Sequence, residues 1–149
     1  LTAQQLWKTT EHSVQFNTPV LKSGFLYGLN AGNDFFCLNA QDGTTCWTAP
    51  FAPAGADATA TPPAGGGPGG RGGRGGRSPV GFGAIVDADS VLLALTPAST
   101  LIAFDADGTA YKELARLKVA ESPSYAYPVV SGNRVFIKDQ DAVALWTVE

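Results

Sequence analysis

The sequence predicts an all-β fold built from short antiparallel strands. Two observations carry this prediction. The apolar segments are short, rich in β-branched and aromatic residues, and separated by Gly, Asp, Asn and Pro. Of the 149 residues, 44% are apolar and only 15% are charged, which is enough apolar content for a packed core.

Eleven strands are expected along the chain. Glu113–Val119 is the one stretch that also suits a helix, but the following Pro123 and the neighbouring strands favour a strand there. The expected strands are Thr18–Leu21, Phe25–Asn30, Phe35–Asn39, Thr44–Thr48, Ala84–Val86, Val91–Thr96, Thr100–Asp105, Tyr111–Val119, Tyr127–Val130, Arg134–Lys138 and Ala142–Val148.

Three segments of the chain repeat the same strand and turn pattern. They are Thr18–Trp47, Ala84–Lys112 and Tyr127–Glu149. Each has three apolar strands separated by polar turns such as LKSG, DADS and SGN, and the first two continue through an Asp-Gly turn into a fourth strand. Trp7 in QLWK lies about 40 residues before Trp47 in TTCW, so QLWK is expected to be the fourth strand of a preceding unit.

A four-stranded antiparallel unit that recurs every ~40 residues is typical of a β-propeller blade. The sequence therefore predicts a partial β-propeller over residues 1–149, with about three blades and an incomplete ring. Gly43 and Gly108 are expected to supply the positive φ of the outer turns. Trp47 is expected to cover the gap between neighbouring blades.

The stretch LNAQDGTTCW resembles the blade-ending motif of the pyrroloquinoline-quinone (PQQ) propeller repeat family, which includes quinoprotein dehydrogenases and cofactor-free, BamB-like propellers. FDADGTAYK, which contains Asp105 and Gly108, resembles a shortened form with Lys112 at the place of the Trp. The residues that match the first motif are Leu38, Asn39, Ala40, Gly43 and Trp47.

The third repeat resembles a chain-terminal blade that lacks its own fourth strand, and in this family the other end of the chain often supplies that strand. Three blades are too few to close a ring, since propellers have typically 4–8. The chain also contains no methionine. We therefore expect the C-terminal part of a larger propeller, whose remainder belongs to the same protein or to a partner chain.

Cys37 and Cys46 lie on either side of the AQDG turn. If the two strands pair with Asn39 opposite Thr44, the two cysteines face each other at a separation close to that of a disulfide. This predicts a cross-strand disulfide and an exported protein, periplasmic or extracellular. Two buried free thiols are the alternative. A zinc site is not expected, because His12 is the only histidine and CxxC spacing is absent.

Residues 52–79 are expected to be a low-complexity loop inserted into the propeller domain. They contain no Val, Ile, Leu or aromatic residue and cannot bury enough apolar area to fold by themselves. The loop carries Arg71, Arg74 and Arg77, which suit a contact with a protein partner. Nucleic-acid binding is not expected, because this run has no interleaved aromatics and the net charge is −3.

No catalytic or metal-binding residues are expected. His12 beside Ser13 has no identifiable acid or oxyanion hole to support nucleophilic catalysis. The Asp and Asn residues at the turns, such as those in DADG and DQD, suit Asx turns, and they lack the full spacing of a calcium loop. No apolar run approaches the ~18 residues of a membrane span.

These observations favour a non-enzymatic, exported propeller segment that acts as a scaffold or protein-interaction module and binds no cofactor. One alternative, implied by the family resemblance, is a fragment of a quinoprotein dehydrogenase that oxidises an alcohol or sugar with PQQ and calcium. Another is an accessory subunit of a larger extracytoplasmic assembly, docked through the loop that carries Arg71, Arg74 and Arg77.

Overall fold

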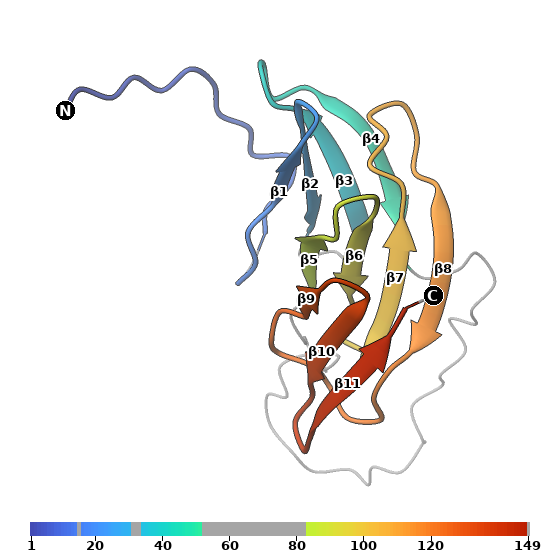
Figure 1. The fold of residues 1–149 in the computed structure, drawn as a ribbon. Coiled ribbons are helices and arrows are strands. Elements are labelled where there is room, and N and C mark those ends of the chain that lie inside the picture. The colour runs from blue at the N-terminus through green and yellow to red at the C-terminus, as the bar shows by residue number, and fades with distance from the viewer. Residues whose placement is uncertain (15, 31–33, 52–82, 149) are drawn as a thin grey trace, which may run out of the picture.

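The computed structural model describes residues 1–14, 16–30, 34–51 and 83–148 (Figure 1). Within these residues the chain is all-β, with eleven strands in three antiparallel sheets and no helix. This confirms the predicted fold class. The predicted loop at residues 52–79, with Arg71, Arg74 and Arg77, lies outside the described residues.

Each sheet is a meander in which strands that follow one another in sequence are also hydrogen-bonded neighbours. We call the sheets blade 1, blade 2 and blade 3. Blade 1 contains β1 (Val20–Lys22), β2 (Phe25–Leu29), β3 (Asp34–Asn39) and β4 (Thr45–Pro50). Blade 2 contains β5 (Ala84–Asp87), β6 (Leu92–Leu95), β7 (Thr100–Phe104) and β8 (Glu113–Lys118). Blade 3 contains β9 (Val129–Ser131), β10 (Arg134–Lys138) and β11 (Val143–Thr147).

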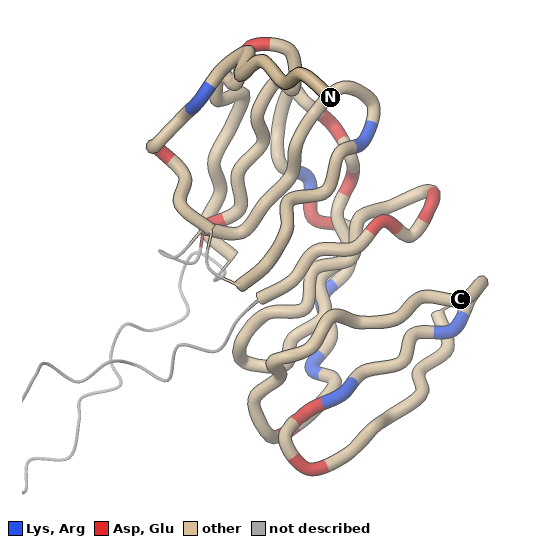
Figure 2. Tube along the Cα trace, turned by 90° about the vertical axis from the view of Figure 1, so that its left-hand side faces the viewer, with Lys and Arg blue, Asp and Glu red and all other residues tan. Residues whose placement is uncertain are grey.

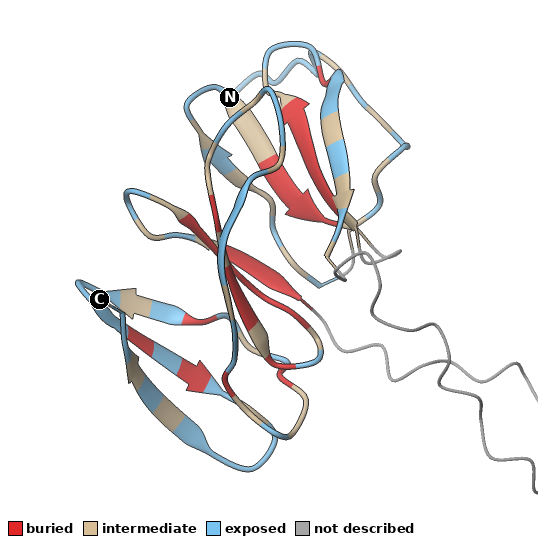
Figure 3. Cartoon of the chain, turned by 90° about the vertical axis from the view of Figure 1, so that its right-hand side faces the viewer, coloured by how far each residue is buried: buried red, intermediate tan, exposed pale blue. Residues whose placement is uncertain are grey.

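The apolar core lies between the blades, in two clusters. The first lies between blades 1 and 2 and contains Tyr27, Phe35 and Phe104. The second lies between blades 2 and 3 and contains Leu93, Leu95 and Ile137 together with their neighbours. Because successive side chains of a strand point to opposite faces, blade 2 is buried on both sides and all four residues of β6 are buried. Figure 3 shows this central sheet as the most continuously buried part of the chain.

Charged residues lie mostly at turns and strand ends, as Figure 2 shows. The strand segments that face a neighbouring blade are almost entirely apolar. This arrangement leaves hydrophobic burial as the main force that holds one blade to the next.

The N-terminal residues 1–14 contain no strand, so the expectation that QLWK forms an outer strand is wrong for this structure. A strand needs a partner to satisfy its backbone groups, and no strand of the described residues pairs with this segment in a sheet. Trp7 is nevertheless half-buried, because its side chain packs on blade 1.

Candidate protein-interaction surface

The contact between blades 1 and 2 shows how one blade of this chain binds the next. Its centre is a group of aromatic rings. Phe35 of β3 stacks on Tyr111, which precedes β8, with ring centroids 5.3 Å apart. It also meets Phe104 of β7 at 5.2 Å. Tyr27 of β2 meets the same Phe104 edge-on at 6.4 Å. The sequence placed Tyr111 at the start of the expected strand Tyr111–Val119, whereas β8 begins at Glu113, and nothing in the sequence marked its ring as part of this contact.

Two tryptophans make equivalent contacts with the outer turn of a blade. The indole nitrogen of Trp47, on β4, donates to the carbonyl oxygen of Asp107 in the β7–β8 turn at 2.8 Å. The indole nitrogen of Trp7 donates to the carbonyl oxygen of Ala40 in the β3–β4 turn at 3.0 Å. Trp7 thus lies on blade 1 as Trp47 lies on blade 2, although no strand forms around Trp7.

The two turn glycines serve different purposes. Gly43 has a φ of +74°, and a Cβ there would also lie 2.5 Å from the Trp7 ring. Gly108 does not have a positive φ, so that expectation is wrong. A Cβ at Gly108 would lie 2.3 Å from the Phe25 ring, so a side chain there would displace the ring that blade 1 packs on the turn of blade 2.

The remaining motif residues stabilise the turns themselves. Leu38 is buried, and the Asn39 side chain accepts a hydrogen bond from the Gln41 backbone nitrogen at 2.9 Å. The Asp105 carboxylate forms an ion pair with the Lys112 ammonium, with Oδ2 and Nζ 3.0 Å apart. The contact of Asn39 with Gln41 is the Asx-type turn chemistry that the sequence indicates.

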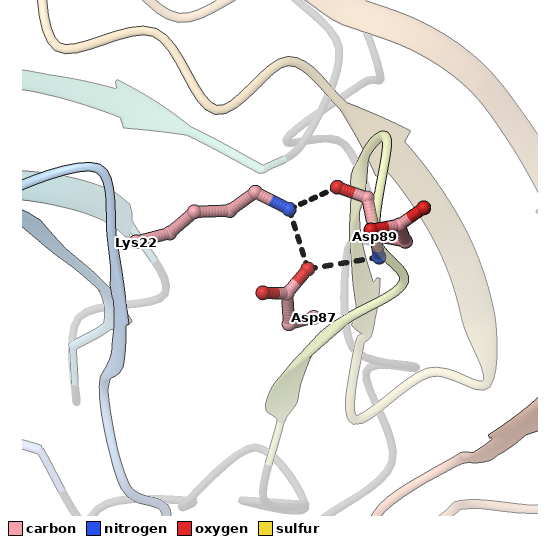
Figure 4. A network of polar contacts seen from close by, with 3 residues as sticks. All are labelled: Lys22, Asp87 and Asp89. Atoms are coloured by element: carbon pink, nitrogen blue, oxygen red, sulfur yellow. Dashed lines mark hydrogen bonds and ion pairs between the residues drawn. The ribbon is translucent and has the colours of Figure 1, made fainter.

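An ion pair joins the inner parts of blades 1 and 2 (Figure 4). The Lys22 ammonium, at the end of β1, lies 2.5 Å from a carboxylate oxygen of Asp87 and also donates to the Asp89 carbonyl. The hydrogen bond from Lys22 lowers the pKa of Asp87 below its usual value. The sequence offered no signal for this pair, because the two residues are far apart in the chain.

The cysteines do not face each other as predicted. β4 carries a bulge at this point: Cys37 pairs with Trp47, Leu38 pairs with Thr45, and Cys46 is the extra residue between them. The predicted register assumed an uninterrupted ladder and is wrong at this position. Both residues are free thiols in the structure, Cys37 buried and Cys46 exposed, so the predicted disulfide stays a prediction.

The two thiols nevertheless interact. Burial, followed by the interaction with Cys46, raises the pKa of the Cys37 thiol to about 12. Tyr27 lies beside Cys37, and burial raises the pKa of its hydroxyl as well. At neutral pH Cys37 is therefore a neutral thiol within the core of the contact between blades 1 and 2.

Blade 3 presents one apolar face that no described residue covers. Val135 and Ile137 of β10 point toward blade 2 and are 1% exposed, whereas Phe136 between them points the other way. Strand pairing places Phe136 between Val129 of β9 and Leu145 of β11. Figure 3 shows the resulting alternation of buried and exposed bands in this blade. The exposed apolar residues of this face are Val129, Phe136, Val143 and Leu145.

An apolar groove of about 220 Å³ runs beside this sheet, between blade 2 and the end of β11. Its walls include Ala103 and Ala115, which pair with each other across β7 and β8. The same positions of blade 1 hold Cys37 and Trp47. Blade 2 has the small side chain of Ala115 at the position of Trp47 in blade 1, and this difference leaves the groove open.

No catalytic or metal-binding arrangement is found among the described ranges. His12 stacks on Phe36 at 4.7 Å and shares a hydrogen bond with Thr45 at 3.0 Å. Within the part of the chain that the structure covers, no three His, Cys, Asp or Glu residues lie close enough together to hold a metal ion. In that part there is also no helix with the length and apolar character of a membrane span.

Comparison with solved structures places the fold among β-propellers. The crystal structure of BamB from Moraxella catarrhalis matches with a TM-score of 0.57 and 12% sequence identity, over 95% of this chain and 36% of that chain. The chain thus spans about a third of that structure's length. Two computationally designed proteins also match at 10% identity: Ika4, TM-score 0.45, over 99% of this chain and all of that one, and Ika8, TM-score 0.43, over 96% and 49%.

No family model matches the sequence, and the search of curated proteins gave no match. What is shown is therefore the fold: three antiparallel sheets arranged like the blades of a β-propeller whose ring is incomplete.

Proposed function

We propose that this chain is a non-enzymatic segment of a PQQ-like β-propeller scaffold, and that the open face of blade 3 binds a further propeller blade. The observation that carries the proposal is the uncovered apolar face of Val129, Phe136, Val143 and Leu145. In the same chain, the equivalent faces of blades 1 and 2 are each covered by the sheet that follows. The likeness to BamB over about a third of its length supports a larger ring.

The further blade belongs either to the same protein or to a partner chain of an extracytoplasmic assembly. An exposed apolar face of this kind marks an interaction site in a soluble protein. The loop that carries Arg71, Arg74 and Arg77 is proposed as an additional contact with a protein partner. We also propose that the protein works outside the cytoplasm, in the periplasm or the extracellular space.

A photo-crosslinking residue in place of Phe136 tests the docking proposal in cells that make the protein. We expect a crosslink to a peptide with the alternating strand pattern of another blade, because that blade would bury Phe136. A crosslinking residue in place of Gln41, exposed in the outer turn of blade 1, is the matched control and should give no such product. A Phe136 position that crosslinks no more than Gln41, or only to proteins without such repeats, would contradict the proposal.

A second test addresses the absence of a cofactor. We expect purified protein, incubated with PQQ and calcium, to show no bound-quinone absorbance and no dye reduction with alcohols or sugars. The measurement is absorbance and dye reduction of the reconstituted protein against a buffer control. Stoichiometric quinone absorbance together with alcohol-dependent dye reduction would favour the quinoprotein dehydrogenase alternative.

A further inference from the structure

The bulge in β4 gives blade 1 a pair of cysteines with opposite exposure. Two residues of the bulged strand β4, Cys46 and Trp47, lie opposite one residue of β3, which is Cys37. The Cys37 side chain lies within the core between blades 1 and 2, and Cys46 lies at the surface beside the Thr44 carbonyl. The Cys46 thiol is therefore accessible to a reagent in solution, whereas the Cys37 thiol is buried.

The fold does not need sulfur at either position. Blade 2 has the same bulge, between Ala103 and Phe104, with Leu114 as the extra residue and Ala115 paired with Ala103. Ala103 thus corresponds to Cys37, and Leu114 corresponds to Cys46. Because one blade forms this bulge with Ala and Leu, packing alone does not explain why the other blade carries two thiols.

We propose that Cys46 and Cys37 form a thiol–disulfide exchange site whose substrate is a low-molecular-weight disulfide such as oxidised glutathione. The exposed Cys46 thiolate attacks one sulfur of that disulfide, which releases one thiol and leaves a mixed disulfide on Cys46. The Cys37 thiolate then attacks the Cys46 sulfur and expels the second thiol. The protein loses two electrons and two protons, and the small disulfide is reduced to two thiols.

The environment of Cys37 makes the second step the slow one. The groups that interact with its thiol are the Tyr27 hydroxyl on β2, the Cys46 thiol on β4 and the Asp107 carboxylate in the turn of blade 2. Burial first, then Cys46 and Asp107, raise the pKa of the Cys37 thiol, whereas the hydrogen bond with Tyr27 lowers it; the net effect keeps Cys37 protonated at neutral pH. Only the thiolate attacks a disulfide, so the rate of closure should rise about tenfold per pH unit between roughly pH 7 and 9.

The site is tested by intact mass after incubation with oxidised glutathione. We expect the wild-type chain to pass through a transient glutathione adduct and to end about 2 Da below the reduced mass. Cys37→Ala, which places the residue of blade 2 at this position, should stop at the adduct, and Cys46→Ala should react little. The closed form should melt about 5 °C above the reduced form.

A pair of cysteines placed at the equivalent positions of blade 2 tests whether the bulge brings the two sulfur atoms together. In a chain with Cys37→Ala and Cys46→Ala, the changes Ala103→Cys and Leu114→Cys should restore the loss of about 2 Da. A wild-type chain that stays at the adduct mass, as Cys37→Ala does, overturns the proposal. A blade 2 pair that stays open overturns the role given to the bulge. This inference does not depend on the proposed docking partner, because every readout uses the isolated chain.

Discussion

Replacing Phe35 by Ala should lower the free energy of unfolding by about 3–5 kcal/mol. Phe35 is fully buried on β3 and its ring contacts Tyr111 and Phe104 of blade 2 at centroid distances of 5.3 and 5.2 Å. The change removes the ring that contacts both Tyr111 and Phe104 and leaves a cavity between the two sheets. Urea-induced unfolding followed by tryptophan fluorescence measures the effect.

The control for Phe35 is Leu21→Ala, since Leu21 is 64% exposed on the other face of blade 1. Its expected effect is within about 0.5 kcal/mol of the wild type. If the two variants unfold at the same urea concentration, the aromatic group does not hold blades 1 and 2 together.

The strands could be predicted from the sequence because their signal is local. All eleven expected strands are present, with boundaries that differ by a few residues. Alternating apolar residues such as those in RVFIK fix both the strand and the face it buries, since the side-chain period is two. The repeated pattern also predicted which strands belong to the same blade, because a unit that recurs is expected to fold in the same way each time.

Features that depend on pairing between strands could not be predicted from the sequence. The bulges after Cys37 and Ala103 add one residue to the outer strand without changing its composition, so no pattern marks them. The spacing after the turn glycine placed Lys112 at the position of Trp47. The backbone hydrogen bond from Asp105 to Lys112 matches that from Asn39 to Thr44, so Ala115 takes the Trp47 position in blade 2.

Contacts between blades were predictable in kind but not in detail. The sequence indicated that a tryptophan would cover the gap between blades, and it offered no means to find the carbonyl that the indole meets. It also missed Lys22 and Asp87, because the ion pair forms only after the two inner turns are brought together by packing. Partner residues of this kind depend on the arrangement of whole sheets, which a single sequence does not contain.

Replacing Trp47 by Ala should destabilise the protein by about 2–4 kcal/mol, somewhat less than Phe35→Ala because Trp47 is only half-buried. The change removes the hydrogen bond to the Asp107 carbonyl and the ring contacts with Tyr27 and Tyr111, at 6.0 and 5.7 Å. Trp47→Phe keeps a ring and loses the N–H donor, so it should cost about 1 kcal/mol, the net worth of the hydrogen bond. Urea unfolding followed by far-UV circular dichroism measures both variants.

The matched comparison is Trp7→Ala, because Trp7 makes the same hydrogen bond to a blade turn, at 3.0 Å, from a segment without a strand. Its expected cost is about 1 kcal/mol, the net worth of the hydrogen bond, because the contacts of His12 with Phe36 and Thr45 still hold the segment on blade 1. Hydrogen exchange should then increase in the β3–β4 turn for Trp7→Ala and in the β7–β8 turn for Trp47→Ala. Equal destabilisation by both alanine variants would show that the N-terminal segment is as firmly bound to blade 1 as β4 is to blade 2.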